Sequence, residues 1–332
     1  MNEEKNGFVY YPIIVTTLNR YSHFKRLVAS LQRNTDSDKT EFVIGLDYPP
    51  SEKYREGYEL IRDYLPTIKG FKKVTIFTTD ENLGPYKNGQ RLRDYIKGLG
   101  YDGYIFTEDD NEFAPNFIQY MNWGLNHFQE DQRIYAICGC NILNTEGFTG
   151  NVFALNNLHV FWGAGFWYNR MEKLDYYRDL KNLRTILDKI PLFKSLTCEL
   201  HKAASILFMI RGGWAYGDTI PNFLNKDERW CVYPKITKVR NWGCEGSGVH
   251  GRNEKAYRMF SQMSLDEIRF FKPEDGDLFS QMMDKRSKIY CRRSLIQYLR
   301  EFILVSSYKL TGRLLIVNRG KKWPKVKLQK VL

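Results

Sequence analysis

Three consecutive carboxylates, Glu108, Asp109 and Asp110, follow directly on the apolar and aromatic run at residues 104–107. Neighbouring residues of an extended chain point to opposite sides, so three adjacent carboxylates cannot all face a hydrophobic core. Like charges placed side by side also repel one another unless a positive charge offsets them. Mg²⁺ and Mn²⁺ prefer carboxylate oxygens and often bind one or two carboxylates together with substrate phosphates. The triplet is therefore predicted to hold a divalent cation, with a solvated loop after a strand as the alternative.

The chain before the triplet alternates between strand and helix patterns. Strands are predicted at residues 8–17, 41–46, 73–78 and 103–107, and helices at residues 22–34, 52–65 and 88–99. This alternation is typical of βαβ units and a mostly parallel sheet. Ligands of such sheets bind beyond the carboxyl ends of the strands. Arg20, Asp47 and the acidic triplet all follow predicted strand ends, so we expect them at one edge of the sheet.

Apolar spacing identifies the buried faces of the first and third helices. In the first, Ser22 is the expected N-cap. The residues expected to face the core are Phe24, Leu27, Val28 and Leu31 in the first helix, and Leu92, Tyr95, Ile96 and Leu99 in the third. Further helices are predicted at residues 115–128, with Pro115 in the first turn, and at residues 196–210.

Several classes of protein are excluded by what the chain lacks. It has no G-x-x-x-x-G-K-[ST] loop, no G-x-G-x-x-G after the first strand and no G-x-S-x-G elbow, which argues against P-loop NTPases, dinucleotide oxidoreductases and α/β-hydrolases. No apolar run approaches the length of about 18 residues that a transmembrane helix needs. Residues 1–6 contain no apolar signal segment, and six cysteines are few for a disulfide scaffold, so a cytoplasmic protein is expected.

The C-terminal segment carries the whole excess of positive charge. Residues 284–332 contain 14 Lys and Arg against two carboxylates, and the net charge of the chain is +12. The apolar residues that share one helix face there are Leu295, Tyr298, Leu299, Phe302 and Ile303. Because basic amphipathic helices lie on anionic membranes, we expect residues 285–332 to bind such a surface. A helix packed on the body of the protein is the alternative, and nucleic-acid binding is less favoured because residues 1–283 are neutral overall.

Four motifs occur in an order that resembles one family. They are PIIVTTLNR at residues 12–20, VIGLD at 43–47, NLGPYKNG at 82–89, and FTEDD at 106–110 followed by Pro115 and Phe117. Together they resemble the GT-A glycosyltransferases, which use a nucleotide-sugar donor and a divalent metal. The acidic motif is similar to that of the inverting N-acetylglucosaminyltransferase I type, and the family-2 transferases are a close second. The likeness covers residues 8–120 well and residues 160–250 more loosely.

This resemblance implies the fold and its division. We expect an α/β protein of the GT-A class, with a Rossmann-like, mostly parallel central sheet, flanking helices and a basic helical C-terminal tail. Residues 8–115 would form the nucleotide-sugar-binding half, residues 116–270 the acceptor-binding half of the same domain, and residues 271–332 the basic amphipathic tail.

The resemblance also assigns roles to the strand ends. Asp110 would bind Mn²⁺ or Mg²⁺ at the donor diphosphate, Asp109 would hold donor hydroxyls, and Glu108 would orient the site. Asp47 would accept a hydrogen bond from the nucleobase, as a carboxylate suits the N3–H group of uracil. Arg20 would lie beside the base or ribose.

Four further residues are assigned less directly. Thr17 is expected to touch the donor, and Lys87 or Arg91 to reach its diphosphate. His250, which follows a glycine-rich loop, is assigned to the metal or diphosphate by the resemblance. Other interpretations stay open: Asp47 as a turn cap, Arg20 as an exposed loop residue, Lys87 as a solvated helix start and His250 as an ordinary loop histidine.

An inverting transfer also needs a base that takes the proton of the acceptor hydroxyl. Asp218 stands in the aromatic segment WAYGD at residues 214–218, where the resemblance places that base. Desolvation by Trp214 and Tyr216 would raise the pKa of Asp218 and make it a better base. An N-cap for a helix that starts at the next residue is the alternative, and Asp227 and Glu228 are alternate bases.

Aromatic residues near glycines are candidate contacts for the acceptor. Flat rings suit the C–H faces of sugars, and glycine lets the backbone approach a ligand closely. The residues assigned to the acceptor are Trp162, Gly165, Phe166 and Trp214, and a core strand with a turn is the alternative for residues 161–167.

These inferences predict a metal-dependent hexosyl- or N-acetylhexosaminyltransferase. It would move a sugar, with inversion, from a UDP-sugar or related donor to a glycan or lipid-linked glycan in surface polysaccharide biosynthesis. A peripheral position on the inner face of a bacterial plasma membrane is expected, because the N-terminal anchor of the eukaryotic branch is absent; no nucleic-acid partner is expected. The alternative is a catalytically inactive GT-A-like binding module, tethered to a membrane or nucleic acid by its basic tail.

Overall fold

The protein forms two compact units. The computed structural model describes residues 7–141, 150–156, 162–172, 179–212, 230–243, 295–318 and 325–330. Unit 1 comprises Met1–Arg170 and Arg229–Met282, and unit 2 comprises Met171–Glu228 and Met283–Leu332.

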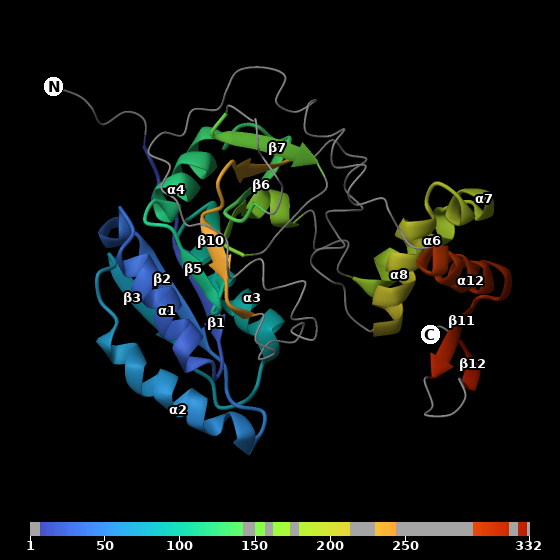
Figure 1. Ribbon diagram of the computed structural model, residues 1–332, viewed down its shortest axis with the longest axis horizontal. Helices are drawn as coiled ribbons and strands as arrows, with labels where there is room; N and C mark the ends of the chain where they lie inside the picture. Colours follow the sequence, from blue (N-terminus) through green and yellow to red (C-terminus); the bar gives the residue numbers. More distant parts are fainter. Residues whose placement is uncertain are drawn as a thin grey trace. The chain divides into compact units, whose positions relative to one another are not determined.

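Unit 1 is built on an eight-stranded sheet with the order β3-β2-β1-β4-β8-β6-β9-β7 (Figure 1). The strands are β1 (Ile13–Thr17), β2 (Glu41–Leu46), β3 (Lys73–Phe77), β4 (Gly103–Glu108), β6 (Ile134–Cys138), β7 (Val152–Asn156), β8 (Ala164–Trp167) and β9 (Trp230–Pro234). Strands β3, β2, β1 and β4 are parallel to one another. Strand β8 is antiparallel to both β4 and β6, β9 is parallel to β6, and β7 is antiparallel to β9. The sheet is therefore mostly parallel, as predicted, and mixed on the β8 side.

Helices cover both faces of this sheet. The helices of unit 1 are α1 (Tyr21–Gln32), α2 (Arg55–Tyr64), α3 (Gly84–Gly98) and α4 (Phe117–His127), with short 3₁₀ helices at Ser37–Lys39, Glu52–Tyr54 and Leu65–Thr67. Residues of α1, α2 and α4 share one apolar core with Ile13 and Val15 of β1. Helix α3 packs on β1, β2 and β4 from the other face. Because successive side chains of β1 point to opposite faces of the sheet, they pack against helices on both faces.

The predicted elements of the N-terminal part are confirmed, with shifted ends. The predicted core residues of the first helix, Phe24, Leu27, Val28 and Leu31, are fully buried. Two predictions about helix starts are wrong. The N-cap of α1 is Arg20 and not Ser22, and Pro115 precedes α4 and does not lie in its first turn.

Helix α3 begins at Gly84, earlier than predicted, since the N–H group of Leu83 at its N-cap is bound by Asp47 Oδ1 at 2.8 Å. That long-range hydrogen bond fixes the helix start. Within α3, Leu92 and Ile96 are buried as predicted, but Leu99 is 46% exposed because it lies beyond the last turn.

A second, two-stranded sheet brings distant residues to the acidic triplet. Strand β5 (Asn111–Phe113) pairs antiparallel with β10 (Val239–Asn241), with Asn241 opposite Asn111 and Val239 opposite Phe113. Strand β5 follows the triplet directly, so this pairing places residues 241–243 against Asp110.

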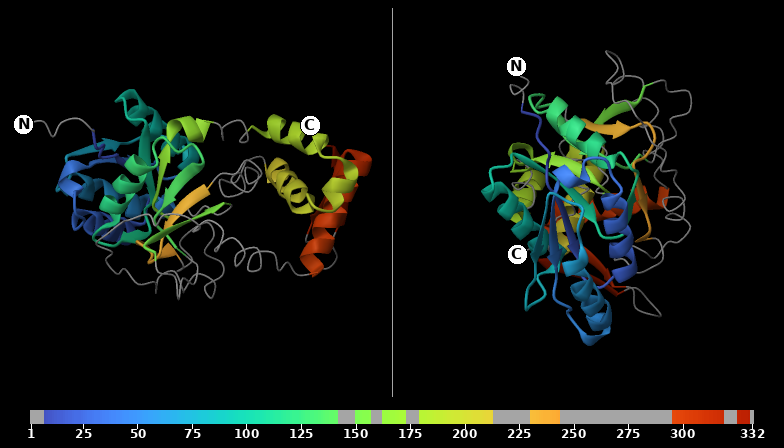
Figure 2. Two further views of the ribbon diagram at one scale, coloured as in Figure 1. Left: turned by 90° about the horizontal axis from the view of Figure 1, so that it is seen from above. Right: turned by 90° about the vertical axis from the view of Figure 1, so that its left-hand side faces the viewer.

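Unit 2 consists of helices around a core of its own. Its described elements are α6 (Leu180–Lys189), α7 (Leu192–Leu196), α8 (Leu200–Gly212), α12 (Leu295–Thr311), β11 (Arg313–Asn318) and β12 (Lys325–Lys330). Helix α12 lies beside α8, as the left view of Figure 2 shows. Leu304, Val305 and Tyr308 of α12 join the core with Leu183, Leu187 and residues of α8.

The prediction of a helical tail is correct for α12 and wrong beyond it. Gly312 adopts a φ of 63°, and its N–H group donates to the carbonyl oxygen of Tyr308 at 2.8 Å, which ends α12. Strands β11 and β12 then form an antiparallel hairpin. The alternating and β-branched sequences RLLIVN and KVKLQK favour extended structure over helix.

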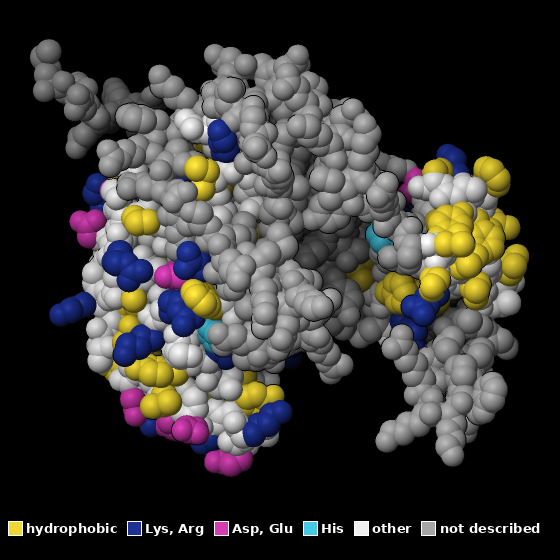
Figure 3. Space-filling view, in the orientation of Figure 1, with side chains coloured by type: hydrophobic (Ala, Val, Ile, Leu, Met, Phe, Trp, Pro, Cys, Tyr) yellow, Lys and Arg dark blue, Asp and Glu magenta, His cyan; other side chains and the backbone are white. Residues whose placement is uncertain are grey.

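The apolar face predicted for the tail helix is exposed. Helix α12 buries the side that carries Leu304 and Val305 and leaves the predicted side open (Figure 3). The exposed fractions are 74% for Leu295, 42% for Tyr298, 48% for Leu299, 38% for Phe302 and 53% for Ile303. Within the described ranges, none of the helices combines the length and the apolar character that crossing a bilayer requires.

Candidate functional site

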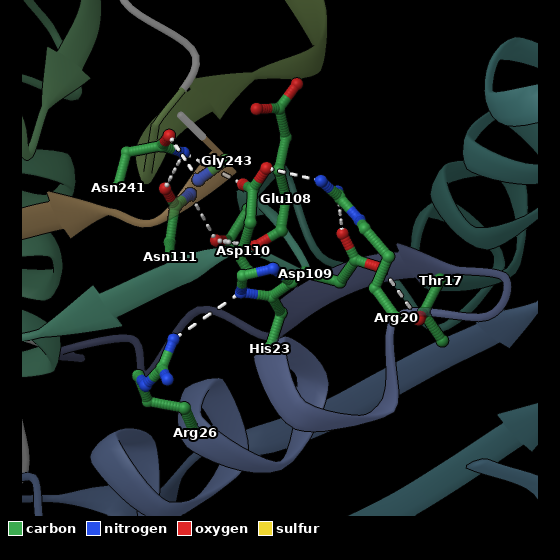
Figure 4. A network of polar contacts seen from close by, with 11 residues as sticks. Thr17, Arg20, His23, Arg26, Glu108, Asp109, Asp110, Asn111, Asn241 and Gly243 are labelled. Atoms are coloured by element: carbon green, nitrogen blue, oxygen red, sulfur yellow. Dashed lines mark hydrogen bonds and ion pairs between the residues drawn. The ribbon is translucent and has the colours of Figure 1, made fainter. Parts of the chain in front are cut away.

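The acidic triplet lies where the parallel strands β1 and β4 end. Glu108 is the last residue of β4, and Asp109 and Asp110 form the turn before β5. Asp109 and Asp110 are only 4% and 6% exposed, whereas Glu108 is partly exposed and its carboxylate points away from the other two (Figure 4). The sequence argument that the three cannot share one direction is confirmed. Two buried carboxylates are left side by side.

Arg20 offsets the charge of both buried carboxylates. Its Nη1 donates to Asp110 Oδ2 at 2.7 Å, and its Nη2 donates to Asp109 Oδ1 (Figure 4). The second oxygen of Asp109 accepts a hydrogen bond from the Thr17 hydroxyl at 2.8 Å. Thr17 ends β1 and Arg20 caps α1, so the β1–α1 turn supplies both donors. Four residues assigned to the site from the sequence are thus brought together by direct contact.

The pKa values of this network follow from burial and charge. Burial raises the pKa of Asp109 above its ordinary value, and the nearby charge of Arg20 opposes that rise. For Arg20, burial acts to lower the pKa, but the charges of Asp109 and Asp110 more than offset it and hold the pKa above its ordinary value. The guanidinium therefore keeps its proton throughout the physiological range.

Strand β10 supplies residues that the sequence did not reveal. Asn241, 4% exposed, donates from Nδ2 to Asp110 Oδ1 at 2.8 Å and to Asn111 Oδ1 at 2.9 Å. Its own Oδ1 accepts the N–H group of Gly243 at 3.0 Å. A Cβ atom on Gly243 would collide with Asp110 Oδ2, so glycine is required there. No sequence motif marks residues 241–243, because only the β5–β10 pairing gives them this position.

Trp242 closes the side of the site next to β5. Its backbone N–H donates to the Asp110 carbonyl oxygen at 2.8 Å, and its indole Nε1 donates to Glu112 Oε2 at 2.9 Å. The guanidinium of Arg26 lies over the indole ring, 4.3 Å from its centroid. These contacts fix the backbone of the acidic turn from both strands of the small sheet.

Asp47 lies at the end of β2 and organises the neighbouring loop. It is 5% exposed, and its Oδ1 accepts the N–H groups of Tyr48 at 3.0 Å and Leu83 at 2.8 Å. Asn82 adds a bond from Nδ2 to the Tyr48 carbonyl oxygen at 2.6 Å. These hydrogen bonds therefore join the segments around residues 47 and 83 next to β1. The turn-capping interpretation of Asp47 matches these contacts, and its contact with a nucleobase stays a prediction.

The two cations proposed for the diphosphate differ in placement. Arg91 of α3 donates from Nη1 to the Thr78 carbonyl oxygen at 3.0 Å and from Nε to Asn88 Oδ1 at 2.9 Å. Burial lowers its pKa from the ordinary value. Lys87 lies exposed on α3, outside the Arg20 network. Its role at a diphosphate remains a prediction.

The aromatic and glycine segment assigned to the acceptor is largely part of the sheet. Phe166 on β8 is 1% exposed and packs against Tyr104 and Tyr135. Gly165 is buried where a Cβ atom would approach Leu125 to 2.9 Å. Packing accounts for both residues, whereas Trp162 is partly exposed. Asp218, Trp214 and His250, with the alternates Asp227 and Glu228, lie outside the described residues.

The chemistry of the donor set suits a hard divalent cation. The site offers carboxylate oxygens that hydrogen bonds hold in fixed directions, the close approach of Gly243 to Asp110 Oδ2, and a guanidinium in the position that a cation would take. Within the part of the chain that the structure describes, no group of three or more His, Cys, Asp or Glu side chains is arranged around a metal position. The residues that fit such an ion are Asp109 and Asp110.

Comparison with known proteins gives distant likenesses to glycosyltransferases. Among solved structures, residues 1–349 of S. aureus TarS are similar over 90% of this chain and 81% of that chain, with 10% identity and a TM-score of 0.39. The mannosyltransferase PcManGT of Pyrobaculum calidifontis, in complex with GDP-Man and Mn²⁺, is similar over 65% of this chain and 68% of that chain, with 11% identity and a TM-score of 0.37. Mouse xyloside xylosyltransferase 1 is similar over 50% of this chain and 69% of that chain, with 10% identity and a TM-score of 0.30.

Sequence comparison adds one partial match. A stretch of 184 residues is 26% identical to the aerobic glycerol-3-phosphate dehydrogenase of Staphylococcus haemolyticus (strain JCSC1435), which is 50% of this chain and 32% of that protein. The chain also spans only 20% of the larger TarS chain to which it is similar. No protein-family model matches. We therefore argue function from the side chains of the site.

Proposed function

We propose that this protein is a glycosyltransferase that moves a hexosyl or N-acetylhexosaminyl group from a nucleoside-diphosphate sugar, in the first place a UDP-sugar. The observation that carries the proposal is the contact of Thr17, Arg20, Asp109 and Asp110 where β1 and β4 end. Parallel sheets bind their ligands at this edge. A pair of carboxylates next to a guanidinium suits a diphosphate with its metal ion, because each charge of the ligand meets its opposite.

Different residues at this edge of the sheet would bind different parts of the donor. Asp110 and Asp109 would hold Mn²⁺ or Mg²⁺, which as a Lewis acid offsets the charge that builds on the leaving diphosphate. Arg20 would offer two parallel N–H groups to phosphate oxygens. Thr17 and Asp47 border the same edge, where we place the ribose and the nucleobase. Lys87 and His250 are proposed as further contacts to the diphosphate and metal.

Transfer with inversion needs a base on the acceptor side. We assign it to Asp218, which would take the proton of the attacking hydroxyl as the bond to the anomeric carbon forms and the bond to the diphosphate breaks. Trp162 and Trp214 would offer ring faces to a glycan or lipid-linked glycan acceptor of surface polysaccharide synthesis.

A dehydrogenase activity does not suit this edge. Dinucleotide-binding folds place glycines between the first strand and its helix, so that the pyrophosphate can approach the helix N-terminus. Here the connection between β1 and α1 reads Leu18, Asn19 and Arg20 and contains no glycine. The partial match to glycerol-3-phosphate dehydrogenase therefore does not change the proposal.

Attachment to an anionic membrane surface is proposed for unit 2. It is supported by the exposed apolar side chains of α12 and by Leu192 and Phe193 of α7, which are 45% and 78% exposed. The basic residues of 284–332 would add attraction to anionic lipids. A peripheral position at the cytoplasmic face would suit a lipid-linked acceptor.

The test is a donor panel with purified protein. We expect release of UDP or GDP from one nucleotide sugar in the presence of Mn²⁺ or Mg²⁺, and loss of that release in Asp110→Asn. The matched control is Asp102→Asn, an exposed carboxylate just before β4, at the opposite edge of the sheet. If no nucleotide sugar is cleaved, the proposed transferase activity is refuted. If, in addition, none raises the melting temperature, the proposed donor binding is refuted as well.

A further inference from the structure

Arg20 holds the oxygens that a bridging cation would need. Asp109 Oδ1 and Asp110 Oδ2 both contact its guanidinium, whereas Thr17 holds the other oxygen of Asp109 and Asn241 the other oxygen of Asp110. A guanidinium and a divalent ion cannot share this position, because they would repel one another and compete for the same lone pairs. The metal site and the Arg20 ion pair therefore exclude each other.

Each of the two carboxylates has a hydrogen-bond partner besides Arg20, and the Arg20 side chain is partly exposed. Asp109 and Asp110 keep their bonds to Thr17 and Asn241, at 2.8 Å each. The Arg20 backbone is held by its carbonyl oxygen, which accepts the Phe24 N–H group at 2.9 Å, and its side chain is 20% exposed. The backbone bond to Phe24 does not involve the Arg20 side chain, so a movement of the guanidinium would leave that bond in place.

We propose that Arg20 is the resident counter-ion of this carboxylate pair, and that a divalent cation binds only as Arg20 transfers to the diphosphate of the donor. This inference rests on the proposed function, and it concerns the order of binding at that site. With both carboxylates ionised, the Arg20 guanidinium and the two carboxylates carry a formal net charge of −1. An incoming diphosphate offers the guanidinium two new oxygens in the planar geometry it prefers. Metal and nucleotide then support each other's binding, while the metal alone competes with Arg20.

The experiment measures Mn²⁺ binding by the electron paramagnetic resonance signal of the free ion, on the full chain without any sugar donor. We expect weak binding by the wild type, and roughly ten-fold to hundred-fold tighter binding by Arg20→Gln, in which the competing charge is gone. Arg20→Lys keeps a positive charge and is expected to stay near the wild type. Asp110→Asn in the Arg20→Gln background should abolish the gain, which assigns it to this site.

A second measurement needs no variant. Wild-type Mn²⁺ affinity is compared with and without UDP, and we expect UDP to tighten it by roughly ten-fold or more. Unchanged Mn²⁺ affinity in folded Arg20→Gln, or equal wild-type affinity with and without UDP, would overturn the inference. Melting curves show whether each variant is folded. If Arg20→Gln is unfolded, the comparison of wild-type Mn²⁺ affinity with and without UDP tests the inference by itself.

These outcomes are distinct from those of the donor panel. If Mn²⁺ binding behaves as expected but no nucleotide sugar is cleaved, the exchange at Arg20 stands and the transferase proposal falls. If a sugar donor is cleaved but Arg20→Gln gains no Mn²⁺ affinity, the transferase proposal stands and the exchange is refuted.

Discussion

Replacing Asn241 with alanine removes the contact that β10 makes with the acidic turn. The substitution removes three hydrogen bonds of the Asn241 amide group. Its Nδ2 donates to Asp110 Oδ1 and Asn111 Oδ1, and its Oδ1 accepts from the Gly243 N–H group. Asn241, Asp110 and Asn111 are 4%, 6% and 0% exposed, so water cannot readily take the place of the lost amide. Asn241→Ala therefore leaves a buried carboxylate oxygen without its neutral donor.

The size of the effect follows from these contacts. A hydrogen bond to a charged group contributes about 1.5–3 kcal/mol, and a buried polar group without a partner costs about 1–3 kcal/mol. We expect the free energy of unfolding to fall by about 2–4 kcal/mol, since partial relaxation makes the three losses less than additive. If Asp110 must keep its direction to hold the donor, kcat/KM should fall by about 10–150-fold, which corresponds to the same 1.5–3 kcal/mol.

The assay compares urea unfolding and donor cleavage in Asn241→Ala and in a matched variant, Asn141→Ala. Asn141 is also 4% exposed, but its Nδ2 donates to the Lys235 carbonyl oxygen at 2.7 Å, which is a backbone group and not a carboxylate. We expect both variants to lose stability and Asn241→Ala alone to lose kcat/KM. Wild-type kcat/KM in Asn241→Ala, or an equal loss in Asn141→Ala, would refute the positioning of Asp110 by Asn241.

Three other predictions follow from the site and from unit 2. Asp218→Asn should keep donor affinity, measured by calorimetry, and lose transfer to the acceptor; an equal loss of both would indicate a structural role. Leu295→Gln with Leu299→Gln should lower binding to anionic vesicles without changing donor cleavage, whereas Leu60→Gln, at a 47% exposed position on α2, should change neither; unaltered vesicle binding in the double variant would count against the membrane proposal. Because burial raises the pKa of Asp109, the stability linked to its protonation is fully present below the ordinary carboxyl value of about 3.9 and is lost as pH rises through the raised value. Asp109→Asn should therefore gain stability relative to the wild type as pH rises, in urea unfolding at several pH values, and a constant difference would contradict this assignment.

The sequence predicted the first half of the fold because its signals are local. The apolar spacing of Phe24, Leu27 and Val28 specifies one face of a helix whatever that face meets. Strand ends at Thr17, Leu46 and Glu108 follow from short apolar runs with turn residues behind them. Since parallel strands align their carboxyl ends, the same reasoning placed Arg20, Asp47 and the triplet at one edge.

Helix and strand ends were less predictable wherever a distant residue sets them. The start of α3 depends on Asp47, 36 positions before Leu83, and its hydrogen bond cannot be seen in the local pattern. The tail was expected to be helical, but Gly312 ends α12 and the hairpin of β11 and β12 follows.

By itself, the sequence determined which chemistry gathers at the sheet edge, because residue types and strand order fix that. Only the tertiary structure decided how its charges are paired. Asn241 lies 131 positions from Asp110 and reaches it through the pairing of β5 with β10, which no local periodicity encodes. Likewise, Arg20 was expected beside a base or ribose, and the structure turns it onto Asp109 and Asp110, because two buried carboxylates need a positive charge close by.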